Sequence, residues 1–355
     1  MADTSRNSEH ELLRLIAIFL IVWYHLISYY LYLIPHSTKF DFILEATLPS
    51  LHIGVIIFIL LSGYWGIKQS LKGISRLILV TAVLYLPLEI VQCIINHGQI
   101  VKVFMFITNT PYWFIRTYLF LYLISPILNT FLNNTTQTKI NYVLFFTGIV
   151  SVYFGSTQGD PSLHDGKNIA NFIFLYILGH TIHHYKNMWK DIPKITITFA
   201  ILLLNLVIFS LLVLFSRNTI IGAYIWLLSM PYCSPLLIIN ALLVFILFSQ
   251  LNFKSKAINN LAKSVLAVYL IHCQPTIHKF VIMPIVETIS RNAFSLSFFE
   301  LSGGIELYKI QVFFYTAGSA ILVMTGCIII DKSLFPIWLF GKIILQKIST
   351  KFAIK

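Results

Sequence analysis

The sequence predicts an all-α polytopic membrane protein in which about ten transmembrane helices enclose a polar core. Hydrophobic residues make up 57% of its 355 residues, against about 45–50% in soluble domains, and the mean hydropathy is +0.82. Apolar segments of about 20 residues, the length that crosses a bilayer, recur along the chain. Lysine and arginine gather in alternate connecting segments. A single integral-membrane domain over residues 1–355 is therefore expected, without a separate soluble domain.

Ten segments are long and apolar enough to be predicted as spanning helices. In order, they are 11–34, 48–67, 75–97, 111–132, 139–156, 168–185, 195–216, 233–252, 260–283 and 308–330. The first is expected to be retained, because its apolar run exceeds that of a signal peptide and no small-residue cleavage site ends it. Three shorter apolar stretches are predicted to be interfacial or re-entrant: 98–108, 219–231 and 334–346. The longest outer loop, Val286–Glu306, is too short for its own core.

The positions of Lys and Arg predict the orientation, because these residues are retained on the cytoplasmic side. With the N-terminus inside, all but eight of the 25 lie in or beside cytoplasmic segments. The exceptions are Lys39, Lys102, Lys167, Arg217, Arg291 and Lys309 in outer segments, and Arg116 and Lys279 at membrane depth. Both termini are expected to be cytoplasmic, as an even helix count requires.

Nucleic-acid and metal binding are not expected. A net charge of +12 favours nucleic acid only when the cations form one patch, which alternate loops do not. GHTIHHY gives His180, His183 and His184 the i, i+3, i+4 spacing of a metal face, but without a carboxylate set or an H-E-x-x-H pattern. The cysteines stand singly and are interpreted as small apolar residues: Cys93, Cys233, Cys273 and Cys327.

Arg14 and His25 lie on one face of the first predicted helix, in LLRLIAIFLIVWYHL. They are eleven residues apart, which places their side chains about 20° from each other with a rise of about 16 Å. Arg14 is expected at the cytoplasmic interface, and His25 near the middle of the membrane. Each has an ordinary explanation alone, as a positive-inside anchor or as a hydrogen-bond partner of a neighbouring helix. Their alignment favours a joint role.

Three further ionisable residues are predicted within the membrane. His272, in SVLAVYLIHCQP, lies about 16–18 Å from the inner end of the ninth helix. Glu89 and Arg116 lie near the outer ends of the antiparallel third and fourth helices, where they are expected to form a buried ion pair. Such a pair either holds two helices together or takes part in function. With His25, these are the candidate catalytic residues.

A basic rim is predicted where the first two helices meet the cytoplasm. Lys68, Lys72 and Arg76 follow the second helix in GYWGIKQSLKGISRLI, close to Arg14. Positive-inside placement alone would account for such a segment. A phosphate-bearing donor entering from the cytoplasm would also use it, because Arg and Lys bind phosphates and the imidazole beyond them accepts a proton.

The chain resembles the acyltransferase family 3 group of bacterial integral-membrane O-acyltransferases over nearly its whole length. Five segments occur in the family's order. They are R-x10-H at Arg14 and His25, HIGVIIFILLSGYWGIKQS with its similarity to G-x-x-x-F-F-x-L-S-G, PYWFIRTYLFLYLISPILN, NFIFLYILGHTI and SVLAVYLIHCQ. One departure follows the second helix, where Lys72 and Arg76 stand in place of the family's denser arginine pair.

The resemblance implies an O-acetyltransferase of the bacterial cytoplasmic membrane. Acetyl-CoA would be the donor, and a hydroxyl of a cell-surface or exported polysaccharide, or of its lipid-linked precursor, the acceptor, with polysaccharide biosynthesis machinery as a partner. Arg14 would help to hold CoA, with Lys72 and Arg76 as further phosphate ligands, and His25 would be essential for transfer. A neutral imidazole is either a general base, worth about 10²–10⁴ in rate, or the carrier of the acetyl group itself.

A proton-coupled transporter or polysaccharide exporter is the competing hypothesis. Buried His, Glu, Arg and Lys residues also suit a proton-coupled carrier. Transporter folds often show inverted repeats and paired Gly/Pro-broken helices, and neither pattern is visible in the sequence. Acyl transfer is therefore the favoured interpretation.

Overall fold

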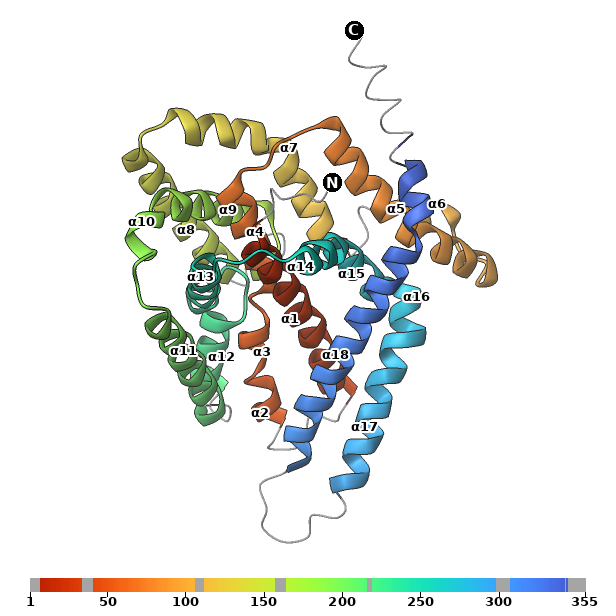
Figure 1. Ribbon diagram of the computed structural model, residues 1–355. Helices are drawn as coiled ribbons and strands as arrows, with labels where there is room; N and C mark the ends of the chain where they lie inside the picture. Colours follow the sequence, from red (N-terminus) through yellow and green to blue (C-terminus); the bar gives the residue numbers. More distant parts are fainter. Residues whose placement is uncertain are drawn as a thin grey trace.

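The computed structural model is a bundle of helices (Figure 1). It describes residues 7–33, 41–105, 112–156, 164–215, 219–297, 307–341 and 343, and contains no strand among them. The α-helices are α1 (Ser8–Leu33), α2 (Asp41–Glu45), α3 (Leu48–Leu51), α4 (Gly54–Trp65), α5 (Leu71–Ile95), α6 (Ile100–Phe104), α7 (Trp113–Asn134), α8 (Gln137–Ser156), α9 (Ile169–His184), α10 (Lys186–Trp189), α11 (Lys194–Phe215), α12 (Thr219–Ser229), α13 (Pro235–Ser249), α14 (Lys256–Leu261), α15 (Val265–His272), α16 (Pro275–Ile277), α17 (Met283–Ser297) and α18 (Leu307–Ser333).

Helices occur in all ten ranges predicted to span, but fewer are long and apolar enough to do so. Among the described residues, six helical segments qualify, or seven if one bent pair counts as a span. The six are Ser8–Leu33, Ile43–Trp65, Leu71–Ile95, Trp113–Asn134, Lys194–Phe215 and Gln311–Ser333. α9 and α13, with 16 and 15 residues, fall short of the roughly 20 required. The chain is thus all-helical with several candidate membrane spans, and six or seven stand in place of the predicted ten.

α1 lies in the middle of the bundle. It packs against α3, α4, α13, α14, α15, α17 and α18, as Figure 1 shows. Its residues Leu13, Ile18 and Leu26 are almost completely buried, in an apolar cluster to which most other helices contribute. α1 therefore carries the polar residues of its own sequence into the centre of the structure.

The start of α1 and the end of α18 lie at the same end of the bundle. Ser8 Oγ accepts a hydrogen bond from the backbone N–H of Ser255, just before α14 (2.9 Å). Lys332 Nζ, near the end of α18, donates to the carbonyl oxygen of Asn260 in α14 (3.0 Å). Two cytoplasmic termini require this arrangement, although the side of the membrane stays a prediction.

The helix predicted over 260–283 is broken, and the prediction of a continuous ninth helix was wrong. After His272 the chain turns by 69°. The break follows from Pro275, because the residue before a proline is disfavoured in helical conformation, and Gln274 adopts φ −67° and ψ 127°. The Gln274 side chain then caps the next helix by accepting a hydrogen bond from the backbone N–H of Ile277 (2.6 Å).

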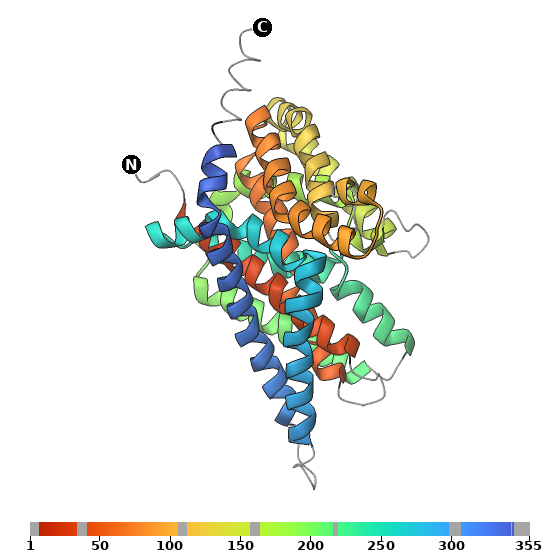
Figure 2. The ribbon, with the colours of Figure 1, turned by 90° about the vertical axis from the view of Figure 1, so that its right-hand side faces the viewer.

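Beyond the break, the chain stays helical for longer than predicted. A π-helical turn at His278–Ile282 leads into α17, which runs beside α18 (Figure 2). The predicted outer loop, Val286–Glu306, is therefore helical through Ser297, and residues 298–306 lie outside the described residues. α17 and α18 both pack against α1, as does α15, so both halves of the broken helix lie beside α1.

α4 and α9 pack closely because each has a glycine at the contact. A Cβ atom at Gly63 would press against the carbonyl oxygen of Tyr176, and one at Gly179 against the carbonyl oxygen of Leu60. Small residues let helix backbones approach in this way. This contact fixes α4, whose other face packs on α1.

We expect Gly63→Ala and Gly179→Ala each to destabilise the folded protein by about 1–3 kcal/mol, because the added methyl group overpacks the contact. Gly318→Ala in α18 is the matched control, since apart from the surrounding backbone of α18 itself no atom of the described residues lies within 4 Å of a Cβ built there. Thermal unfolding of the purified proteins in one detergent measures the effect. Parent-like melting of both contact variants would contradict the close packing of α4 on α9.

Candidate active site

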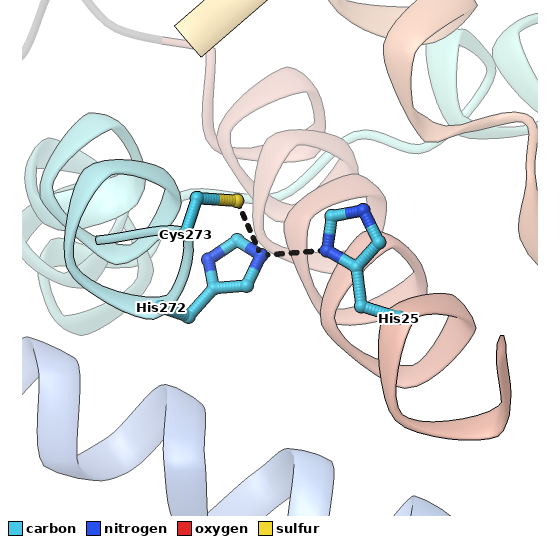
Figure 3. Close-up of side chains that lie close together, drawn as sticks. All are labelled: His25, His272 and Cys273. Carbon is cyan, nitrogen blue, oxygen red and sulfur yellow. Dashed lines mark hydrogen bonds between the residues drawn. The ribbon is translucent and has the colours of Figure 1, made fainter. Parts of the chain in front are cut away.

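Two histidines that are distant in sequence meet between α1 and α15 (Figure 3). His25 Nδ1 lies 3.0 Å from His272 Nε2. His272 is buried, with 3% of its surface exposed, whereas His25 is half-buried. Both are predicted site residues, and the structure brings them into direct contact.

The hydrogen bonds around this pair indicate where its protons lie. His272 Nδ1 is 2.7 Å from the carbonyl oxygen of Val268. A carbonyl oxygen only accepts, so Nδ1 carries the hydrogen and Nε2 of the neutral ring is an acceptor. His25 Nδ1–H therefore donates to His272 Nε2, and His25 keeps a lone pair on its own Nε2. That nitrogen is the one available as a base or a nucleophile.

Cys273 is a third polar side chain at the pair. Its Sγ lies 3.3 Å from His272 Nε2 (Figure 3). The donor atoms of His25, His272 and Cys273 all lie within 4.8 Å of one another. The sequence interpretation of Cys273 as an apolar residue missed this contact, and its position directly after His272 was the available signal.

Glu89 contacts the helix break and not the predicted partner, Arg116. Its Oε1 accepts hydrogen bonds from Gln274 Nε2 (2.8 Å) and Thr276 Oγ1 (2.9 Å). None of the ion pairs found between described residues joins Glu89 to Arg116. Glu89 needs no cation as a partner because the helix break turns the side chains of Gln274 and Thr276 toward α5, where both donate hydrogen bonds to its carboxylate. Glu89 is thus a positioning residue for the corner that follows His272.

A cavity of about 290 Å³ lies between α1, α4, α5, α7 and the start of α15. Three cations line it: Arg14, Arg76 and Lys263. Each stands near the beginning of its helix, and the remaining lining is largely apolar and aromatic. Arg14 and Arg76 are predicted donor-binding residues, whereas Lys263 was missed. Lys263 comes shortly before His272 in the chain, just as Arg14 comes shortly before His25.

The cavity extends along α1 toward the histidine pair. Ile21, which lines it, precedes His25 by four residues and therefore lies on the same helix face. Tyr269, on the opposite wall, has its ring 6.1 Å from that of His272. Arg116 belongs to the first turn of α7, next to the lining residue Ile115. The cavity lining thus includes three cations and largely apolar walls, and two of its residues, Ile21 and Tyr269, are neighbours of the histidine pair.

A second, more open hollow of about 690 Å³ shares Arg14 with the cavity. Its lining is Asn7, His10, Glu11, Arg14, Trp65, Gly66 and Lys68. Glu11 Oε1 accepts from Arg14 Nη1 at 2.8 Å and holds the guanidinium between the two spaces. Lys72 is exposed at the start of α5 and is not among the lining residues of either space.

Aromatic and histidine rings continue from His25 on the side away from Arg14. The rings of Tyr29 and His25 stack at 5.8 Å, and His278 meets Tyr29 edge-on at 4.5 Å. His278 Nε2 is buried without a hydrogen-bond partner among the described residues. His25 thus has the ring of Tyr29 beside it, and His278 lies next to that ring.

Comparison with known proteins gives the family. The acyltransferase 3 family model, described as an acyltransferase domain, matches residues 7–332. Searches of curated proteins and of solved structures gave no significant match. The match covers nearly the whole chain, including both histidines and all three cavity cations, and the chain carries several helices able to span a membrane. The protein therefore belongs to the acyltransferase 3 family and is a multi-pass membrane acyltransferase.

Proposed function

We propose that this protein is an O-acetyltransferase. It moves an acetyl group from cytoplasmic acetyl-CoA to a hydroxyl of a cell-surface or exported polysaccharide, or of its lipid-linked precursor. The observation that carries the proposal is a largely apolar cavity that has three cations in its lining and lies on the two helices that bring His25 and His272 together. Membership of an acyltransferase family supplies the class of reaction.

The donor's phosphates are assigned to Arg14, Arg76 and Lys263. A guanidinium offers a planar pair of donors to a phosphate, and an ammonium adds a point charge. On the cavity wall, Ser62 Oγ and Tyr118 Oη lie 3.3 Å apart and offer polar groups to the amides of the carrier arm. The apolar residues beyond them suit the rest of the arm, which reaches toward His25.

The reaction needs the lone pair on His25 Nε2. In direct transfer, this nitrogen takes the proton of the acceptor hydroxyl while the hydroxyl oxygen attacks the thioester carbon. The C–S bond breaks, and the leaving thiolate receives the proton. His272 stabilises the charge that forms on His25, because its Nε2 accepts the hydrogen bond from Nδ1–H. In a relay, Nε2 attacks the thioester carbon itself and the C–S bond breaks. The acetyl group then passes from Nε2 to the hydroxyl oxygen, and the thiolate receives the hydroxyl proton.

The acceptor is proposed to approach from the side of Tyr29 and His278. Tyr29 lies one helical turn beyond His25, away from the cation Arg14. Donor and acceptor then reach the same nitrogen from opposite ends of α1. Such an arrangement supports transfer from a cytoplasmic carrier to an acceptor on the outer side of the membrane.

The orientation rests on the same assignment of the donor. We propose that the start of α1, which carries Arg14, and with it the end of α18 face the cytoplasm, and that the protein lies in a bacterial cytoplasmic membrane. A reporter domain that is active only in the cytoplasm should be active when it is fused to either terminus. A reporter that needs export serves as the control, and its activity at either end would reverse the side from which the donor enters.

His25→Gln is expected to lower acetylation of the polysaccharide by about 10²–10⁴-fold, the contribution of a general base. The measurement is the acetyl-ester content of surface polysaccharide from cells that express each variant in place of the parent. His184→Gln, an exposed histidine at the end of α9, is the matched control and should behave as the parent. Normal ester content combined with lost export of the polysaccharide would favour the transporter hypothesis.

Replacing Arg14 or Lys263 by Ala should weaken binding of acetyl-CoA about 10–100-fold, because a hydrogen bond to a charged group contributes about 1.5–3 kcal/mol. Arg14→Lys should recover part of the loss, since Lys lacks the planar fork. Lys72→Ala is the control, because Lys72 lines neither space. Calorimetric titration of the purified proteins measures the affinities. Equal weakening by Lys72→Ala would assign the phosphates to the exposed rim and not to the cavity.

A further inference from the structure

Two nitrogens and one sulfur converge at the site from α1 and from the corner after α15. His25 Nδ1 and Cys273 Sγ lie 3.0 Å and 3.3 Å from His272 Nε2. All three atoms fall within 4.8 Å of one another. In Figure 3 the thiol of Cys273 and the ring of His25 both face the same nitrogen of His272. The acyl-transfer mechanism uses the two histidines and leaves the thiol without a task.

These separations are close to those of a tetrahedral zinc site. Bonds of about 2.0–2.1 Å to nitrogen and about 2.3 Å to sulfur place neighbouring ligand atoms about 3.3–3.6 Å apart. The two short distances here are within a few tenths of an ångström of that range. The remaining separation, between Cys273 and His25, is no more than 4.8 Å, so metal binding requires one of these half-buried side chains to rotate.

The backbone already orients the central ligand. His272 Nδ1–H is bonded to the carbonyl oxygen of Val268, so its Nε2 lone pair points at the shared space. A second hydrogen bond of this kind on a ligating histidine is typical of metal sites. On binding a metal, Cys273 loses its proton to solvent, and His25 moves its hydrogen from Nδ1 to Nε2.

We propose that His25, His272 and Cys273 form a binding site for Zn²⁺, with the fourth position open. Imidazole and thiolate together select zinc over Mg²⁺ or Ca²⁺, which take oxygen ligands. The bound ion occupies the acceptor nitrogen of His272 and Nδ1 of His25, and it leaves Nε2 of His25 protonated, without the lone pair that acyl transfer uses. Zinc is therefore an inhibitor of acyl transfer. Binding of the metal stands independently of the proposed function, whereas the inhibition rests on it.

The first test measures zinc bound to the purified full-length protein after equilibration with Zn²⁺ and removal of excess, by elemental analysis. One equivalent is expected for the parent. Cys273→Ser should weaken binding about tenfold or more, and Cys93→Ser, which replaces another half-buried cysteine, should not. Equal zinc content in the Cys273→Ser and parent proteins would overturn the proposal.

Cobalt(II) supplies a second readout that does not depend on activity. The parent bound to Co²⁺ should show a near-ultraviolet thiolate-to-metal absorption band, which is lost in Cys273→Ser. A cobalt complex of the parent without this band would overturn the site.

The transfer assay then tests inhibition: zinc should slow the parent and Cys93→Ser and leave Cys273→Ser much less affected. Stoichiometric zinc binding by a chain that transfers no acyl group even when it is free of zinc would refute the proposed function and leave the metal site standing.

Discussion

The hydrogen bond between His272 and the carbonyl oxygen of Val268 is the contact on which the site depends. It determines which nitrogen of His272 carries hydrogen and hence the direction of the hydrogen bond to His25. A backbone group of α15 thereby leaves a lone pair on the far nitrogen of His25. If the ring were free to turn, His272 would donate to His25 as readily as accept from it, and the reactive nitrogen would not be defined.

That contact is maintained by the break in the helix. α15 ends at His272 because Pro275 disfavours a helical residue before it. Gln274 caps the next helix and also donates to Glu89 on α5, and Thr276 donates to the same carboxylate oxygen. Breaking Glu89 away from the corner would leave the buried side-chain amide of Gln274 without this acceptor, which costs about 1–3 kcal/mol. The corner is therefore held from two directions, and Cys273 is fixed beside the pair.

α1 joins the two ends of the proposed reaction path. Arg14 and His25 stand on one face of one rigid helix, so their separation is set by helix geometry and not by the packing of two elements. The other cavity cations, Arg76 and Lys263, come from α5 and from the turn before α15. The close packing of α4 on α9 holds α4 in place, and the other face of α4 packs against α1. The polar groups of this apolar bundle thus come from few side chains, carried by two long helices, α1 and α5, and by the turn before α15.

The sequence by itself determined the helical class, the approximate ranges of the helices and the shared face of Arg14 and His25, because these follow from hydropathy and helical periodicity within one segment. It also indicated the family, through short motifs in order. Only the tertiary structure decided the partners: His272 beside His25, Gln274 and Thr276 in place of Arg116 for Glu89, Lys263 in the cavity, and Cys273 at the pair. Periodicity gives the direction of a side chain on its own helix. A contact also depends on the rotation, depth and bending of the facing helix. For the helix that carries His272, the break before Pro275 changed its course.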